Sequence, residues 1–175
     1  MHRWIATALA MAVSFTPPVH AATVYETQAQ FLERAFGPSV PAPGVIWLSG
    51  ERKAAVSGML GHDYPALRLR YWCRENRSAW LLEEIGKELP ITTGVIIDGD
   101  VINSLRVLTY RENRGGEVVA PAFTDQFNGV GLNGSGQLQA RIDGISGATL
   151  SVRALTRLAA MALYLDAESG CGDGA

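Results

Sequence analysis

The feature that most constrains this fold is a run of residues with a period of two between positions 66 and 112. In ALRLRYWC, at 66–73, apolar and polar residues alternate, which is typical of a half-buried strand. SAWLLEEIG at 78–86 and ITTGVIID at 91–98 predict two more strands. Asp98-Gly99 fits a tight hairpin turn, after which VINSLRVLTYRE, at 101–112, returns antiparallel. The sequence therefore predicts an antiparallel sheet.

Helical periodicity flanks these strands. One helical face is predicted in 26–36, and a second helix between Trp47 and Leu60, with Ser49 as its N-cap and Gly61 at its end. The longest apolar stripe runs from 148 to 167 and can lie on the sheet. The predicted class is α+β: an antiparallel β-sheet flanked by helices.

The connecting segments are less regular. GPSVPAPG at 37–44 predicts a linker between elements, 121–128 one or two helical turns, and the glycine-rich 128–136 a loop. The alternation in 137–143 predicts one further strand.

The first 21 residues predict an export signal. Arg3 precedes an apolar run, and Val19-His20-Ala21 offers small residues at a cleavage site. An uncleaved membrane anchor is the alternative, but the run is shorter than the ~20 residues that a spanning helix needs. We expect an exported protein, periplasmic if the source is Gram-negative.

The remaining composition indicates a compact domain. The chain is 47% hydrophobic with a formal net charge of -2, and a mildly acidic surface argues against nucleic acid as a partner. No catalytic triad and no metal-binding cluster is recognised. Cys73 and Cys171 are the only cysteines. Export would let them form a disulfide, whereas the glycine-rich tail around Cys171 argues against it, so both states stay open.

The stretch Ser146-Gly147-Ala148-Thr149 opens the last predicted helix with small residues. Ser146 is a good N-cap, which would place Thr149 at the third helical position. The free amides and the partial positive charge of a helix start also stabilise a phosphate, and the small side chains leave the backbone open. An ordinary helix start remains the simplest explanation of these residues taken alone.

A serine hydrolase is the first alternative, because GISGA at 144–148 is one residue from the G-x-S-x-G nucleophile elbow. His62 is the only histidine outside the first 21 residues, and it precedes Ser146, the reverse of the order in α/β-hydrolases. The antiparallel sheet is also wrong for that fold, so this alternative is disfavoured.

DGISGAT, at 143–149, resembles the D-x-x-S-G-A-T flavinylation motif of bacterial FMN-binding domains, such as those of the sodium-pumping NADH:quinone reductase and the Rnf complex. LTYRENRGGEV at 108–118 and FTDQFNG at 123–129 resemble two further blocks of that family, in the same order. Where many members have Glu-Thr-Pro-Gly, however, only Glu112 and Gly115 match in this chain.

The resemblance implies that Thr149 carries FMN as a phosphoester, attached by a separate Mg-dependent flavin transferase that uses FAD. It implies that the transferase recognises Asp143 and 146–149, although Asp143 could equally serve a plain Asp-Gly turn. Ser146, Gly147 and Ala148 would seat the phosphate, and Glu112, Gly115 and Gly116 are candidates for contact with the flavin ring. For Glu112 a solvated strand end, and for Gly116 a turn glycine, are equal alternatives.

Three nearby residues receive weaker assignments. Ser151 is a rival acceptor that we interpret as helix surface. Arg111 and Arg114 could favour the reduced flavin anion, but ordinary surface charge is the simpler interpretation of both.

The sequence patterns and the resemblance together divide the chain into a signal at 1–21, an N-terminal helical region at 22–66 that packs on the domain, the FMN-binding domain at 67–168 and a flexible tail at 169–175. The predicted function is electron transfer between a membrane-bound redox partner and an acceptor. A flavin-binding sensory module and an interaction domain without flavin are the alternatives.

Overall fold

The computed structural model describes residues 22–172, so the predicted export signal lies outside the described residues. Its centre is a sheet of six antiparallel strands in the order β1-β6-β5-β4-β3-β2. The predicted α+β class is therefore confirmed. The strands are β1 (Thr23–Val24), β2 (Pro43–Trp47), β3 (Arg68–Arg74), β4 (Arg77–Ile85), β5 (Pro90–Asp98) and β6 (Val101–Tyr110).

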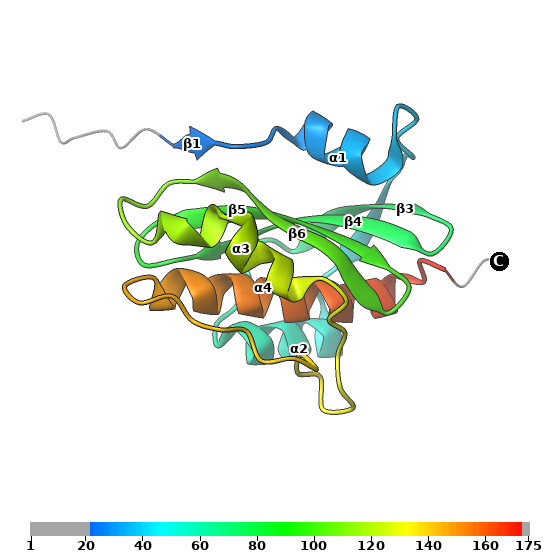
Figure 1. The fold of residues 1–175 in the computed structure, drawn as a ribbon. Coiled ribbons are helices and arrows are strands. Elements are labelled where there is room, and N and C mark those ends of the chain that lie inside the picture. Colours follow the sequence, from blue (N-terminus) through cyan, green and yellow to red (C-terminus); the bar gives the residue numbers. More distant parts are fainter. Residues whose placement is uncertain (1–21, 173–175) are drawn as a thin grey trace, which may run out of the picture.

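Helices lie on both faces of the sheet (Figure 1). The longest, α4, lies beneath the sheet beside α2, and α1 lies above it. Short helical turns follow β6 and pack against it. The helical elements are α1 (Gln28–Phe36), α2 (Gly50–Leu60), η1 (Gly116–Val119), α3 (Pro121–Thr124), η2 (Asp125–Phe127) and α4 (Thr149–Ser169).

The main core forms between the sheet and α4. Trp80 and Leu82 of β4 and Leu155 and Leu158 of α4 are fully buried in it. Burying a side chain of this size contributes about 1.5–3 kcal/mol. This packing fixes α4 along the sheet, and with it the place where the helix begins.

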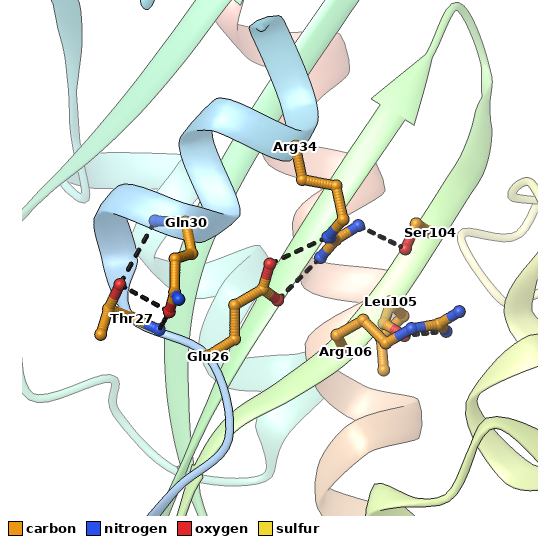
Figure 2. Close-up of polar contacts among 7 residues, drawn as sticks. All are labelled: Glu26, Thr27, Gln30, Arg34, Ser104, Leu105 and Arg106. Carbon is orange, nitrogen blue, oxygen red and sulfur yellow. Dashed lines mark hydrogen bonds and ion pairs between the residues drawn. The ribbon is translucent and has the colours of Figure 1, made fainter. Parts of the chain in front are cut away.

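A smaller core lies under α1 on the opposite face. Phe31 packs so closely on Gly94 that a Cβ there would lie 2.5 Å from the ring. Thr27 and Gln30 form a capping box at the helix start, as Figure 2 shows. Arg34 pairs with Glu26 and donates a hydrogen bond to Ser104 of β6 (Figure 2).

The segment 22–66 supplies strands as well as helices. It forms β1 at one edge of the sheet and β2 at the other. The sequence predicted a linker over 37–44 and a helix between Trp47 and Leu60 with Ser49 as its N-cap. The structure instead has strand β2 over Pro43–Trp47, whereas α2 begins at Gly50 with Ser49 at the predicted cap position.

The strand predicted over 137–143 is wrong. An isolated bridge between Leu132 and Leu138 is the only ladder contact there within residues 22–172. The backbone N–H of Asp143 is instead bound by the side chain of Gln126. The segment is an irregular loop that passes below α4 in the view of Figure 1.

Cys73 and Cys171 form a disulfide, which decides the question that the sequence left open. The bond fixes Cys171 on β3, so the expected flexible tail is anchored at this residue; the last positions, 173–175, lie outside the described residues. No helix within residues 22–172 has the length and apolar character needed to cross a bilayer.

Candidate functional site

The site is built around the first turn of α4. The helix begins at Thr149, Ala148 holds the N-cap position, and the first intrahelical bond runs from the Val152 N–H to the Ala148 carbonyl at 2.9 Å. The amides of residues 149–151 precede this bond, so helix geometry leaves them open to an outside acceptor. An anion placed here would also meet the positive end of a 21-residue helix.

The predicted cap at Ser146 is therefore wrong, and Thr149 is the first helical residue instead of the third. The cause is Gly147, whose φ of 84° turns the chain before the helix starts. The Ala148 N–H then bonds to the Ile145 carbonyl at 3.0 Å, and Ser146 remains exposed outside the helix. Thr149 is exposed at the first position of α4, in the same turn as the open amides.

Ser151 does not lie on the helix surface as predicted. It is 4% exposed, and its hydroxyl lies 3.0 Å from that of Tyr110 at the end of β6. Thr149 is thus the exposed hydroxyl of the two and Ser151 the buried one. The rival acceptor is removed from solvent.

A cleft of about 400 Å³ opens at this helix start. Its walls come from three stretches: the turn between β4 and β5, the segment after β6, and the start of α4. The lining residues are Lys87, Glu88, Glu112, Asn113, Arg114, Gly147, Ala148, Thr149, Leu150 and Ser151.

Glu112 lies in the cleft wall, and its carboxylate binds the β4–β5 turn. Its Oε1 accepts hydrogen bonds from the backbone N–H groups of Lys87 and Glu88, both at 2.6 Å, and of Leu89 at 2.9 Å. Burial raises the pKa of Glu112, but the three backbone hydrogen bonds outweigh it and hold the pKa below its ordinary value. Glu112 is therefore a charged carboxylate at neutral pH, engaged by this chain's own backbone.

The two candidate glycines lie behind the cleft. Gly115 is buried with a φ of 79°, and a Cβ there would lie 3.3 Å from the Ala148 Cβ. Gly116 begins η1, and a Cβ on it would lie 3.8 Å from the Tyr110 ring. Gly115 permits close packing of the block at 108–118 on the start of α4.

The block at 123–129 contacts the motif at 143–149 through Gln126. Its side-chain oxygen accepts a hydrogen bond from the Asp143 N–H at 2.7 Å, while Asp143 itself is exposed. Phe123 and Phe127 anchor this block, with their rings packed edge to face. The fold thus brings together the three blocks recognised in the sequence.

The charged residues near the cleft differ in placement. Arg114 lines it. Arg111 lies elsewhere, bonded to the Pro90 carbonyl and to the Thr92 hydroxyl at 2.9 Å each, in agreement with a structural surface role. Lys87, which no sequence motif singled out, lines the cleft and pairs with Glu88 at 3.2 Å. Packing of the β4–β5 hairpin against α4 brings this turn to the helix start, so no local sequence signal identified it.

The fold and the site define a class of protein, an α+β domain with a cleft beside a helix start whose first backbone amides have no intrahelical partner. Residues 86–164 match the model of the FMN-binding domain. The resemblance predicted from the three sequence blocks is thereby confirmed.

The comparison with solved structures found a component of the Na(+)-translocating NADH-quinone reductase from Parabacteroides distasonis. It is 17% identical with a TM-score of 0.47, and the match covers 72% of this chain and 78% of that chain. No curated protein matches the chain.

Proposed function

We propose that the protein carries FMN as a phosphoester on Thr149 and transfers electrons between a membrane-bound redox partner and an acceptor. The observation that carries the proposal is the exposed hydroxyl of Thr149, at the first position of α4 and in the wall of the cleft. The hydroxyl lies within the segment that matches the FMN-binding domain.

The residues present fit a flavin phosphate. Three open amides at the helix start and a partial positive charge favour the phosphate without a basic side chain. The cleft volume of about 400 Å³ lies in the range of small-molecule sites, and Leu150 offers it a half-exposed apolar side chain. When bound, FMN supplies the redox chemistry, while the protein sets its position and charge environment.

Attachment is proposed to occur by transfer from FAD. The Thr149 oxygen bonds to the phosphorus on the riboflavin side, the bond from that phosphorus to AMP breaks, and the hydroxyl proton leaves with AMP. A flavin transferase with Mg²⁺ catalyses this step. Asp143, Ser146, Gly147 and Thr149 are exposed for recognition by it, and Ala148 is buried as their anchor.

Export is also part of the proposal. The disulfide between Cys73 and Cys171 supports it, because such bonds persist in oxidising compartments. A covalent tether suits an exported flavoprotein, since a flavin that dissociates outside the cytoplasm is lost by dilution. Mass analysis of the chain recovered from the exported fraction should place its N-terminus at Ala22.

The attachment is tested by intact-mass measurement after co-expression with a flavin transferase. The wild type should gain one FMN less one water, and Thr149→Ala should gain nothing. Thr156→Ala, on the same helix two turns on, is the matched control and should be modified like the wild type. An unmodified wild type, beside a positive-control domain that the same transferase does modify, would refute the proposal.

Electron transfer is tested separately on the modified protein. Stopped-flow absorbance should show bleaching of the flavin with reduced membrane fractions and its return with an acceptor, over repeated cycles. A sensory module instead predicts flavin-dependent binding of a partner without steady electron flow.

A further inference from the structure

The segment from Tyr110 to Gly115 contacts both walls of the cleft. It leaves β6, lines the cleft at Glu112 and Arg114, and packs against the start of α4 at its end. The two contacts differ in chemistry, because one is a charged hydrogen-bond cluster and the other is close neutral packing.

The charged contact holds the β4–β5 turn. Within residues 22–172 this turn has one backbone bond of its own besides the strand ladder, from the Gly86 N–H to the Leu89 carbonyl at 3.1 Å. The three amides of residues 87–89 all converge on one oxygen of Glu112. A carboxylate that accepts several backbone N–H bonds forms charge-assisted bonds, which are about twice as strong as neutral ones.

The neutral contact fixes the other wall. The Tyr110 hydroxyl donates its proton to the Arg114 carbonyl, so Ser151 donates to the Tyr110 oxygen across 3.0 Å. Burial raises the pKa of Tyr110, which keeps the hydroxyl protonated. Gly115 lies against Ala148 and Ser151 without room for a side chain. One end of the segment is therefore fixed on α4 and cannot follow the turn if the turn moves.

We propose that Glu112 is a positioning residue that holds the β4–β5 turn against the start of α4, and so sets where Lys87 stands in the flavin cleft. Glu112 acts through the turn. The placement of Lys87 beside a flavin rests on the proposed function. The hydrogen bonds from the turn to Glu112 are present in the protein without flavin.

Protonation of Glu112 should weaken its hydrogen bonds with the three amides of the turn, because a neutral carboxyl is a weaker acceptor than a carboxylate. The charged and titratable groups around it are Lys87 and Glu88 on the turn and Tyr110 and Arg114 on its own segment. The start of α4 contributes only neutral side chains to the cleft. The turn should therefore be held above the pKa of Glu112 and loosen as the pH falls through it.

The first test uses the unmodified protein. In an NMR pH titration, the amide protons of residues 87–89 should shift together with one midpoint, below that of an ordinary glutamate. Glu112→Gln should abolish this common titration and accelerate hydrogen exchange of the three amides. Glu117→Gln, an exposed glutamate five residues on, is the matched control and should change neither. Amides that titrate independently, or that stay protected in Glu112→Gln, would overturn the proposal.

The second test uses the flavinylated protein and a double-mutant cycle on the flavin midpoint potential. Lys87→Met should lower the potential because it removes a positive charge beside the flavin. In the Glu112→Gln background, the same change should have about half the effect or less, since Lys87 is no longer held. Equal effects in both backgrounds would show that Glu112 does not position Lys87. A wild type that gains no FMN would refute the proposed function alone, because the amide titration does not need the flavin.

Discussion

Gln126 and Asp143 are joined by a hydrogen bond of 2.7 Å from the backbone N–H of Asp143 to the side-chain oxygen of Gln126. The bond connects the short helices after β6 to the loop that precedes Thr149 and α4. The bond joins the block at 123–129 to the motif at 143–149. It fixes the loop at Asp143, which lies 17 residues after Gln126 in the chain.

Gln126→Ala should therefore slow flavinylation more than it destabilises the fold. An exposed bond of this kind contributes about 1 kcal/mol, whereas the loop before Thr149 loses a fixed point. The rate of FMN addition with transferase, followed by intact mass, should fall several-fold, and urea unfolding should change little. Gln137→Ala, in the same connection, is the control. Equal flavinylation rates in the two variants would contradict the prediction.

Gly115→Ala should be strongly destabilising. Its φ of 79° disfavours any side chain, at a cost of about 1–2 kcal/mol, and the new Cβ would lie 3.0 Å from the Tyr110 hydroxyl and 3.1 Å from that of Ser151. Overpacking adds about 1–3 kcal/mol. We expect the free energy of unfolding in urea to fall by roughly 2–5 kcal/mol.

Gly134→Ala is the control for this measurement, since its Cβ would meet nothing within 4 Å and its φ is not in the left-handed region. Its free energy of unfolding should stay near that of the wild type. Similar losses in both variants would mean that the packing of Gly115 on α4 is not the cause.

The sheet was predicted from the sequence because alternation and hairpin turns are local signals. Strand β2 was missed, because Pro43 and Gly44 at its start have the composition of a linker. Its pairing with β3, distant in sequence, makes it a strand. The alternation in 137–143 failed for the opposite reason, since Gln126 binds the Asp143 N–H and no neighbouring strand pairs with the segment within residues 22–172.

The assignment of Thr149 as the FMN attachment residue came from the motif and stays a prediction, whereas its predicted helical position is wrong. Ser146 has the chemistry of a cap, yet the left-handed Gly147 before the helix gives that position to Ala148. The burial of Ser151 did have a signal. It lies four residues before Leu155 and seven before Leu158, on the same apolar face. The role of Glu112 had none, because its partners are backbone amides of a distant turn.

Removing the disulfide should lower stability and leave the cleft intact. Cys73 and Cys171 are 98 residues apart in sequence, and loss of a link that closes a loop of this length typically costs about 2–5 kcal/mol. Cys171 lies beyond the end of α4, whereas the cleft lies at its start. Cys73→Ser/Cys171→Ser should unfold at lower urea and still accept FMN on Thr149. Unchanged unfolding by urea, with and without reductant, would contradict this prediction.

His62 should make stability depend on pH near neutrality. Its Nδ1 lies 3.0 Å from the Asp63 carbonyl and its Nε2 lies 2.8 Å from the buried carboxylate of Glu84, so the protonated ring donates to both. The bond to the Asp63 carbonyl raises the pKa of His62 most, followed by the bond to Glu84.

The raised pKa means that the folded chain binds this proton more tightly than the unfolded chain does, where the pKa is near 6.5. The contribution of His62 to the free energy of unfolding is therefore complete below the unfolded pKa of about 6.5, and it is lost as the pH rises through the higher pKa of the folded state. The difference in urea stability between wild type and His62→Gln should be largest near pH 6 and shrink toward pH 8. Histidines at 2 and 20 cancel in this difference, because both proteins carry the same N-terminus. If the stability difference between the two proteins is constant or grows with pH, the protonated ring of His62 does not stabilise the fold through its bonds to Glu84 and Asp63.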